Sequence, residues 1–178
     1  MHTGRKDMKA LFVIAQEGFQ DHEYAAPKQI LEDAGIEVIT ASKQIGRCKG
    51  SFGAITEAIV SLAEAKVAEY NVIIFIGGPG AVDYQHDQEA HHLVKEVVKE
   101  NKLLAAICIA PTILAYAGVL KGKQATVWNG DGQQSKVLEK NGATYVNKPV
   151  VVDGKIITAN GPPAAEEFGK KIVELLKH

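Results

Sequence analysis

The sequence has no excess of charge of either sign. It contains 20 Lys and Arg against 21 Asp and Glu, which leaves a formal net charge of −1. Proteins that bind the phosphate backbone of DNA or RNA need clustered positive charge, and this composition does not provide it. We therefore expect no nucleic acid among the partners of this protein.

Long apolar runs are also absent. No run approaches the roughly 20 residues that span a bilayer, and the N-terminal residues MHTGRKDMK contain no apolar core of a secretory signal. We expect a soluble, cytoplasmic protein with no membrane partner.

Cysteine is scarce as well, since Cys48 and Cys108 are the only two. Two thiols are too few for a disulfide scaffold, and a reducing compartment keeps thiols free. Neither cysteine is expected to form a structural disulfide, so each is either a reactive thiol or a side chain packed in the core.

What is present is the composition of an ordinary globular domain. The chain has 178 residues, of which 46% are hydrophobic and 23% charged, enough to bury one core. Residues 1–8 are polar and precede the first apolar run, which predicts a tail or an expression remnant. Residues 9–178 are expected to form a single domain.

Wholly apolar segments alternate with segments of helical periodicity at intervals of about thirty residues. This alternation is typical of βαβ units and predicts a flavodoxin-like α/β sandwich, with a mostly parallel central sheet and helices on both faces. Residues 46–53 are expected to form a turn, 62–70 a short helix, and Asp153-Gly154 a hairpin. The main strands are predicted at residues 9–15, 36–42, 71–76 and 103–108, and the main helices at 23–34, 88–99 and 164–177.

Cys108 lies where an apolar strand ends and a helix begins, in the segment AAICIAP (residues 105–111). A nucleophile elbow needs small residues two positions before and after the nucleophile, and alanines 106 and 110 meet that need. Backbone N–H groups and the dipole at a helix start favour thiolate and lower the pKa of a thiol. The alternative is a small buried hydrophobic residue, but the position on the turn favours a reactive cysteine.

Several motifs resemble the ThiJ/PfpI superfamily, which has a class I glutamine-amidotransferase-like fold. Its members include a Parkinsonism-associated protein deglycase, PfpI-type intracellular cysteine peptidases, glyoxalases and chaperones. The resemblance covers nearly the whole chain and implies a cysteine nucleophile. The motifs are KALFVIA, DHEYAAP, Gly77-Gly78, AICIAPTIL, AGVLKGK and VVVDGKIITA.

The resemblance also implies a partner for the cysteine. The family's glutamate stands four residues before the proline of the first helix, a position that Glu23 occupies relative to Pro27. A carboxyl next to a thiolate tends to keep its proton, because two adjacent anions repel. The oxyanion donors of the family map onto the backbone N–H groups of Gly78 and Ile109. The alternative for Glu23 is an acid that stabilises the start of the helix.

The sequence departs from the family pattern at the catalytic base. PfpI-type peptidases have a histidine directly after the cysteine, where this chain has Ile109. The histidine that the deglycase places on a later strand is matched by Trp128. The only histidine after His92 is His178, which excludes an amidotransferase triad.

Five further residues are candidates for the pocket around Cys108. Trp128 is expected to wall the pocket, since indole offers one donor and no base. His22 is expected to be a surface or interface histidine, because its place on the helix points it away from the site. The five candidates are Gly77, Trp128, Asn129, His22 and Asp83.

Other local signals are weaker. His91 and His92 are adjacent on a helix and point in different directions, so with His86 they predict a solvated face and no metal site. The glycines at 77–80 lack the Lys-Ser/Thr of a P-loop. Cys48, expected in a polar loop, is a secondary redox candidate.

Our leading functional hypothesis is a stress-response enzyme of glyoxalase or deglycase type. Cys108 would attack the carbonyl of a small 2-oxoaldehyde or its protein adduct, with Glu23 moving protons and no cofactor. The main alternative is a redox sensor or chaperone that uses oxidation of Cys108. A PfpI-type peptidase or amidase is disfavoured, because its base would have to come from a second subunit. By resemblance we expect a homodimer or larger homo-oligomer.

Overall fold

The computed structural model describes residues 7–178. The predicted tail at residues 1–8 therefore falls mostly outside the described residues. Met8, which was expected in that tail, packs against the apolar core.

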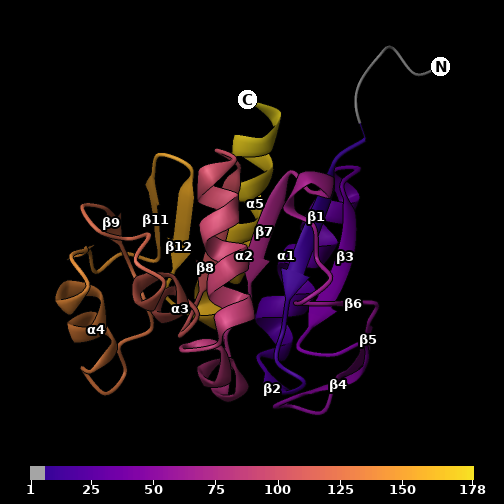
Figure 1. Cartoon of the computed structure of the whole chain (residues 1–178), viewed down its shortest axis with the longest axis horizontal. Helices are drawn as coiled ribbons and strands as arrows, with labels where there is room; N and C mark the ends of the chain where they lie inside the picture. The colour runs from indigo at the N-terminus through magenta and orange to yellow at the C-terminus, as the bar shows by residue number, and fades with distance from the viewer. Residues whose placement is uncertain (1–6) are drawn as a thin grey trace.

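A seven-stranded sheet forms the centre of the molecule (Figure 1). Every neighbouring pair is parallel except β11 with β12, which form the antiparallel hairpin predicted at Asp153-Gly154. The mostly parallel α/β architecture predicted from the sequence is confirmed. In spatial order the strands are β11 (Val150–Asp153), β12 (Ile156–Ala159), β8 (Leu103–Ile107), β7 (Val72–Phe75), β1 (Lys9–Val13), β3 (Glu37–Ser42) and β6 (Val60–Ser61).

Helices cover both faces of the sheet (Figure 1). Successive residues of a strand point to opposite faces, so the apolar strands feed two separate cores. Phe12 and Phe168 belong to the core under α1 (Asp21–Asp33) and α5 (Ala165–Lys177). The opposite core lies under α2 (Gln88–Lys99) and α3 (Pro111–Tyr116), with α4 (Gln134–Lys140) packed against α3.

Shorter elements complete the fold outside the central sheet. Three strands form a small sheet beside the start of α1, and two form a ribbon near α4. The small sheet contains β2 (Glu17–Phe19), β4 (Gly46–Gly50) and β5 (Ile55–Ala58), the ribbon contains β9 (Gln124–Ala125) and β10 (Thr144–Tyr145), and 3₁₀ helices span Val67–Glu69, Pro79–Tyr84 and Pro162–Ala164.

The small sheet corrects the interpretation of residues 46–53 as a turn. The first five of them form β4, because β2 and β5 supply hydrogen-bonding partners on both sides that periodicity cannot reveal. Cys48 is consequently buried on a strand, and burial raises the pKa of its thiol. It is therefore not the exposed redox cysteine that the sequence suggested.

Two helix predictions also change. The first helix begins at Asp21, two residues before Glu23, because the side chain of Gln20 caps it. The short helix expected at residues 62–70 is reduced to a single 3₁₀ turn at Val67–Glu69. None of the helices within residues 7–178 is long and apolar enough to cross a bilayer.

The fold brings three connections together at the end of the sheet where the parallel strands finish. They follow β1, β7 and β8, whose carboxyl ends lie side by side because these strands are parallel neighbours. Open α/β sheets bind ligands outside the carboxyl ends of their strands, where neighbouring connections run to opposite faces of the sheet. The fold thus places Glu23, Gly77 and Cys108 in one region.

We predict that truncating Phe168 tests the packing of α5 on the sheet. Phe168 is fully buried, so Phe168→Ala should lower the free energy of unfolding by about 3 to 5 kcal/mol. Phe52→Ala is the matched control: that ring is 80% exposed, and its loss should change the value by less than about 0.5 kcal/mol. Urea denaturation followed by circular dichroism measures both. Equal losses would contradict the packing described above.

Candidate active site

Cys108 sits in a strained turn between β8 and α3. Its φ of 66° lies in the left-handed region, which costs a non-glycine residue roughly 1 to 3 kcal/mol. Two hydrogen bonds hold it there: its N–H donates to the carbonyl of Ala159 at 2.9 Å, and its carbonyl accepts from the N–H of Trp128 at 2.8 Å. The predicted elbow is thus present, and neighbouring segments fix its shape.

Glu23 reaches the cysteine from the first turn of α1. The side-chain oxygen of Gln20 caps this turn by accepting from the N–H of Glu23 at 2.8 Å. The Glu23 side chain is fully buried and interacts with the thiol of Cys108. Its Oε1 accepts from the N–H of Gly77 at 3.1 Å. Its Oε2 is buried without a hydrogen-bond donor of good geometry among the described residues.

Gly77 lets these two side chains approach each other. A Cβ on this residue would lie 2.5 Å from the Cβ of Cys108 and 2.7 Å from Oε1 of Glu23. Gly78 has a φ of 108°, and a Cβ there would meet the carbonyl of Gly18 at 2.4 Å. Both positions therefore require glycine, one for space and the other for backbone conformation as well.

The surroundings of Glu23 move its protonation into the neutral pH range. Burial raises the pKa of the carboxyl from 4.5 to about 7, although the contacts with Cys108 and the N–H of Gly77 pull it down. Placing a proton on the carboxyl would also relieve the lone Oε2, since an unpaired buried oxygen is costly when charged. The Glu23 carboxyl can therefore both donate and accept a proton near neutral pH.

The pKa of Cys108 is raised, whereas the sequence predicted that it would be lowered. Burial and the neighbouring Glu23 carboxylate raise it to about 12, and the N–H groups of Gly78 and Ile109 oppose this only in part. The expected contribution of a helix dipole is small, because α3 has six residues and begins three residues after Cys108. The same two N–H groups nevertheless face the sulfur, as the family resemblance implied.

The two groups hold one negative charge between them over a wide pH range. Above about 7 the carboxyl gives up its proton, and below about 12 the thiol keeps one. Because two adjacent anions repel, the pair keeps one proton over this range, and that proton rests on the sulfur beside the carboxylate. The site thus places a thiol beside a carboxylate that can accept its proton.

A cavity of about 330 Å³ opens on Cys108. No histidine lines it, and within residues 7–178 no group of three or more His, Cys, Asp or Glu is placed to hold a metal ion. The imidazoles of His86 and His91 are engaged elsewhere, with the ring of Tyr116 and the carbonyl of Gln85. The lining residues are Gln20, Gly78, Pro79, Cys108, Ile109, Trp128 and Pro162.

The structure separates the predicted pocket residues into two sets. Gly77 and Trp128 lie at the site, and Asn129 lines an adjoining cavity with Trp128. His22 is exposed and lines neither of these cavities, as its helix position predicted.

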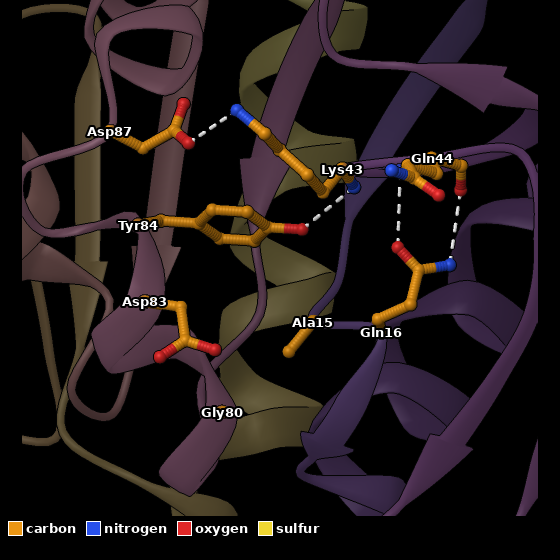
Figure 2. Close-up of a pocket in the computed structure, with 8 residues that line it drawn as sticks. All are labelled: Ala15, Gln16, Lys43, Gln44, Gly80, Asp83, Tyr84 and Asp87. Atoms are coloured by element: carbon orange, nitrogen blue, oxygen red, sulfur yellow. Dashed lines mark hydrogen bonds and ion pairs between the residues drawn. The ribbon is translucent and has the colours of Figure 1, made fainter.

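Asp83 does not lie with Cys108, contrary to expectation. The 3₁₀ helix after Gly78 carries it into a different cavity, which Ala15 and Gln16 line from the other side (Figure 2). Lys43 pairs with Asp87 across the same cavity. The sequence could not foresee this, because the glycines of residues 77–80 leave the direction of the following turn open.

Two residues of the site could not be predicted from the sequence. Gln20 lines the cavity and caps α1, but glutamine is not among the usual capping residues, so the pattern gave little signal. Pro162 comes from the connection after β12, which only the folded sheet brings to Cys108.

Comparison with known proteins identifies relatives along almost the whole chain. The model of the DJ-1/PfpI family matches residues 8–175. An uncharacterised protein of Methanocaldococcus jannaschii is 36% identical over 173 residues, covering 97% of this chain and 84% of the relative. Deglycase PfpI of Pyrococcus furiosus is 30% identical over 170 residues, covering 96% of this chain and 100% of the relative. The crystal structure of a ThiJ/PfpI domain protein from Brachyspira murdochii superposes with a TM-score of 0.92 at 28% identity, covering 97% and 98% of the two chains.

We predict that the buried carboxyl makes stability depend on pH. The pKa of Glu23 is about 7 in the folded protein, against its ordinary value of 4.5. The neutral carboxyl therefore contributes its full stabilisation of the folded state below pH 4.5, and this contribution is lost as the pH rises through 7. Relative to Glu23→Gln, the wild-type protein should lose about 3 kcal/mol over this range. Urea denaturation of both proteins between pH 4 and pH 8 measures the difference. Parallel stability profiles would rule out a carboxyl with a raised pKa.

Proposed function

The chain belongs to the DJ-1/PfpI family, and on that premise we propose that it is a cysteine-dependent enzyme of deglycase or glyoxalase type. Its substrates would be reactive 2-oxoaldehydes or the adducts that these form with proteins. The observation that carries the proposal is the contact of Cys108 with Glu23 at a cavity whose lining contains no histidine. Relatives named as deglycases support the same class of reaction.

The first step is addition of sulfur to the aldehyde carbon. The Glu23 carboxylate accepts the thiol proton while the C–S bond forms, so no separate thiolate has to be stable beforehand. The aldehyde oxygen becomes an oxyanion that accepts hydrogen bonds from the N–H groups of Gly78 and Ile109. Transfer of the proton from Glu23 to this oxygen gives a neutral hemithioacetal.

The remaining steps require no oxidant. Glu23 removes the hydrogen from the former aldehyde carbon and delivers a proton to the neighbouring carbon, which turns the hemithioacetal into the thioester of a 2-hydroxy acid. Water then cleaves the thioester and releases the acid and the free thiol. The net change is addition of one water to the 2-oxoaldehyde, so electrons and atoms balance.

Peptide cleavage has less support from the same geometry. Expulsion of an amine requires a general acid beside the leaving nitrogen, which cysteine peptidases supply with a histidine. Ile109 occupies the position next to the cysteine, and the described residues around the cavity offer no imidazole. A free aldehyde has no leaving group, so the Cys108–Glu23 pair suffices for it, and the geometry supports the free 2-oxoaldehydes better than their amine adducts.

We predict that the protein converts methylglyoxal to lactate through Cys108. Cys108→Ala should reduce the rate by at least about 100-fold, because it removes the nucleophile. Cys48→Ala is the matched control and should keep the rate, since that thiol is buried on β4 away from the cavity. Lactate is measured with a coupled enzymatic assay. Lactate formation that survives Cys108→Ala would defeat the proposal.

A second candidate function is oxidation of Cys108 as a sensor. One observation favours it: Oε2 of Glu23 is buried without a donor of good geometry within residues 7–178, and a protonated Glu23 has a hydrogen to give to an oxygen on sulfur. Two equivalents of peroxide would convert the thiol to a sulfinic acid, with water as the other product. The raised pKa of the thiol works against this reaction, because the thiolate is the form that peroxide attacks.

We predict that the two candidate functions separate under mild peroxide. If Cys108 is a sensor, intact-mass analysis shows a gain of two oxygens that Cys108→Ser abolishes and Glu23→Gln reduces. If the enzyme hypothesis alone holds, the mass stays unchanged under conditions where methylglyoxal is still consumed. A gain located on another residue would exclude the sensor.

A further inference from the structure

A second cavity adjoins the one at Cys108 and has no part in the reaction described above. It measures about 490 Å³, and Trp128 and Pro162 line both cavities. A molecule as small as methylglyoxal fills only part of the space at Cys108 and leaves the second cavity to water. The site is therefore larger than the smallest proposed substrate requires.

The chemistry of the second cavity is polar but uncharged. Its lining includes the amides of Asn129, Asn147 and Asn160 and the phenol of Tyr145, and none of the described residues that line either cavity has a charged side chain. The side chains of Asn147, Asn160 and Tyr145 form no hydrogen bond with the described residues. They therefore offer donors and acceptors that only water or a ligand can satisfy.

Asn129 adds a donor of known direction. Its side-chain oxygen accepts from the N–H of Ser135 at 3.0 Å, and its NH₂ group has no hydrogen-bond partner among residues 7–178. The amide is thus held in one orientation and presents hydrogen-bond donors. A ligand group that meets it must be an acceptor, such as a hydroxyl oxygen.

Trp128 supplies an apolar platform between the two cavities. Its indole lies against Gly130, where a Cβ would come within 2.4 Å of the ring, and 39% of the residue remains exposed. The backbone N–H of Trp128 is bonded to the carbonyl of Cys108, which fixes the platform relative to the nucleophile. An exposed aromatic face beside neutral amides suits the C–H faces and hydroxyls of a sugar-like chain.

We infer that the cavity of Trp128, Asn129, Asn147 and Asn160 is a subsite for a neutral polyhydroxyl chain. Together with the proposed function, on which this identification of the substrate rests, it makes sugar-derived 2-oxoaldehydes the preferred substrate class. Their carbonyl end reaches Cys108 while the hydroxylated tail lies along Trp128 and exchanges water contacts for the asparagine amides. A charged tail finds no counter-ion in either lining.

The first experiment measures binding without turnover. Trp128 is the only tryptophan of the chain, so its fluorescence reports occupancy of the subsite directly. In the Cys108→Ser protein we expect a saturable emission change with D-glucitol, a polyol that has no carbonyl, and at least a tenfold weaker response in Asn160→Ala. Hexane-1,6-diol, which has the same chain length and few hydroxyls, should bind at least tenfold more weakly than glucitol.

The matched control is Asn101→Gly. Asn101 is exposed and lies just before the amino end of β8, at the end of the strand away from Cys108. Its φ is 57°, a value that glycine adopts readily. This variant should bind glucitol as the parent does. No saturable change up to about 100 mM glucitol, or equal binding of the diol, would overturn the subsite.

The second experiment measures specificity. We expect kcat/KM for 3-deoxyglucosone to exceed that for methylglyoxal at least tenfold, and the ratio to fall at least tenfold in Asn160→Ala through a higher KM for the larger aldehyde. A ratio near one in the wild-type protein would overturn the substrate class. Absence of turnover with both aldehydes, while glucitol still binds, would defeat the proposed function and leave the polyol subsite in place.

Discussion

The proposed chemistry depends on a buried carboxyl and a neighbouring thiol that carry one negative charge between them. The carboxyl of Glu23 is removed from water, held at one oxygen by the N–H of Gly77, and pressed against Cys108. Two anions at this distance would repel each other, so one of the two groups keeps its proton. Addition of sulfur to a carbonyl needs a group that accepts the thiol proton, and the proposed steps assign this role to the Glu23 carboxylate without a histidine.

The fold supplies this contact by bringing together backbone segments that are far apart in sequence. The capped first turn of α1 delivers the carboxyl, the turn after β7 provides a glycine with no side chain in the way, and β8 ends in the strained elbow. Bonds from Ala159 and Trp128 to the backbone of Cys108 fix the elbow in place. The same bond to Trp128 ties the wall of the cavity to Cys108.

Much of this arrangement could be predicted from the sequence, and the exceptions have physical causes. The apolar runs at β1, β7 and β8 identify a parallel sheet, and the helix at Gln88–Lys99 was predicted with its observed bounds because its periodicity is regular. The strand at Gly46–Gly50 was missed because its partners are distant in sequence. The contact of Glu23 with Cys108 came from family resemblance, whereas the raised pKa of the thiol depends on burial, which no local pattern reports. Asp83 was misplaced for a similar reason, since a glycine turn sets its direction.

The most direct test of the account is a titration of Glu23 itself. Carbon-13 NMR of the glutamate carboxyls, assigned with Glu23→Gln, follows protonation of this one side chain in the folded protein. The account predicts a midpoint of about 7 for Glu23 in the wild-type protein. A midpoint near the ordinary 4.5 would show that burial does not raise the pKa of this carboxyl, and would contradict the exchange of its proton near neutral pH.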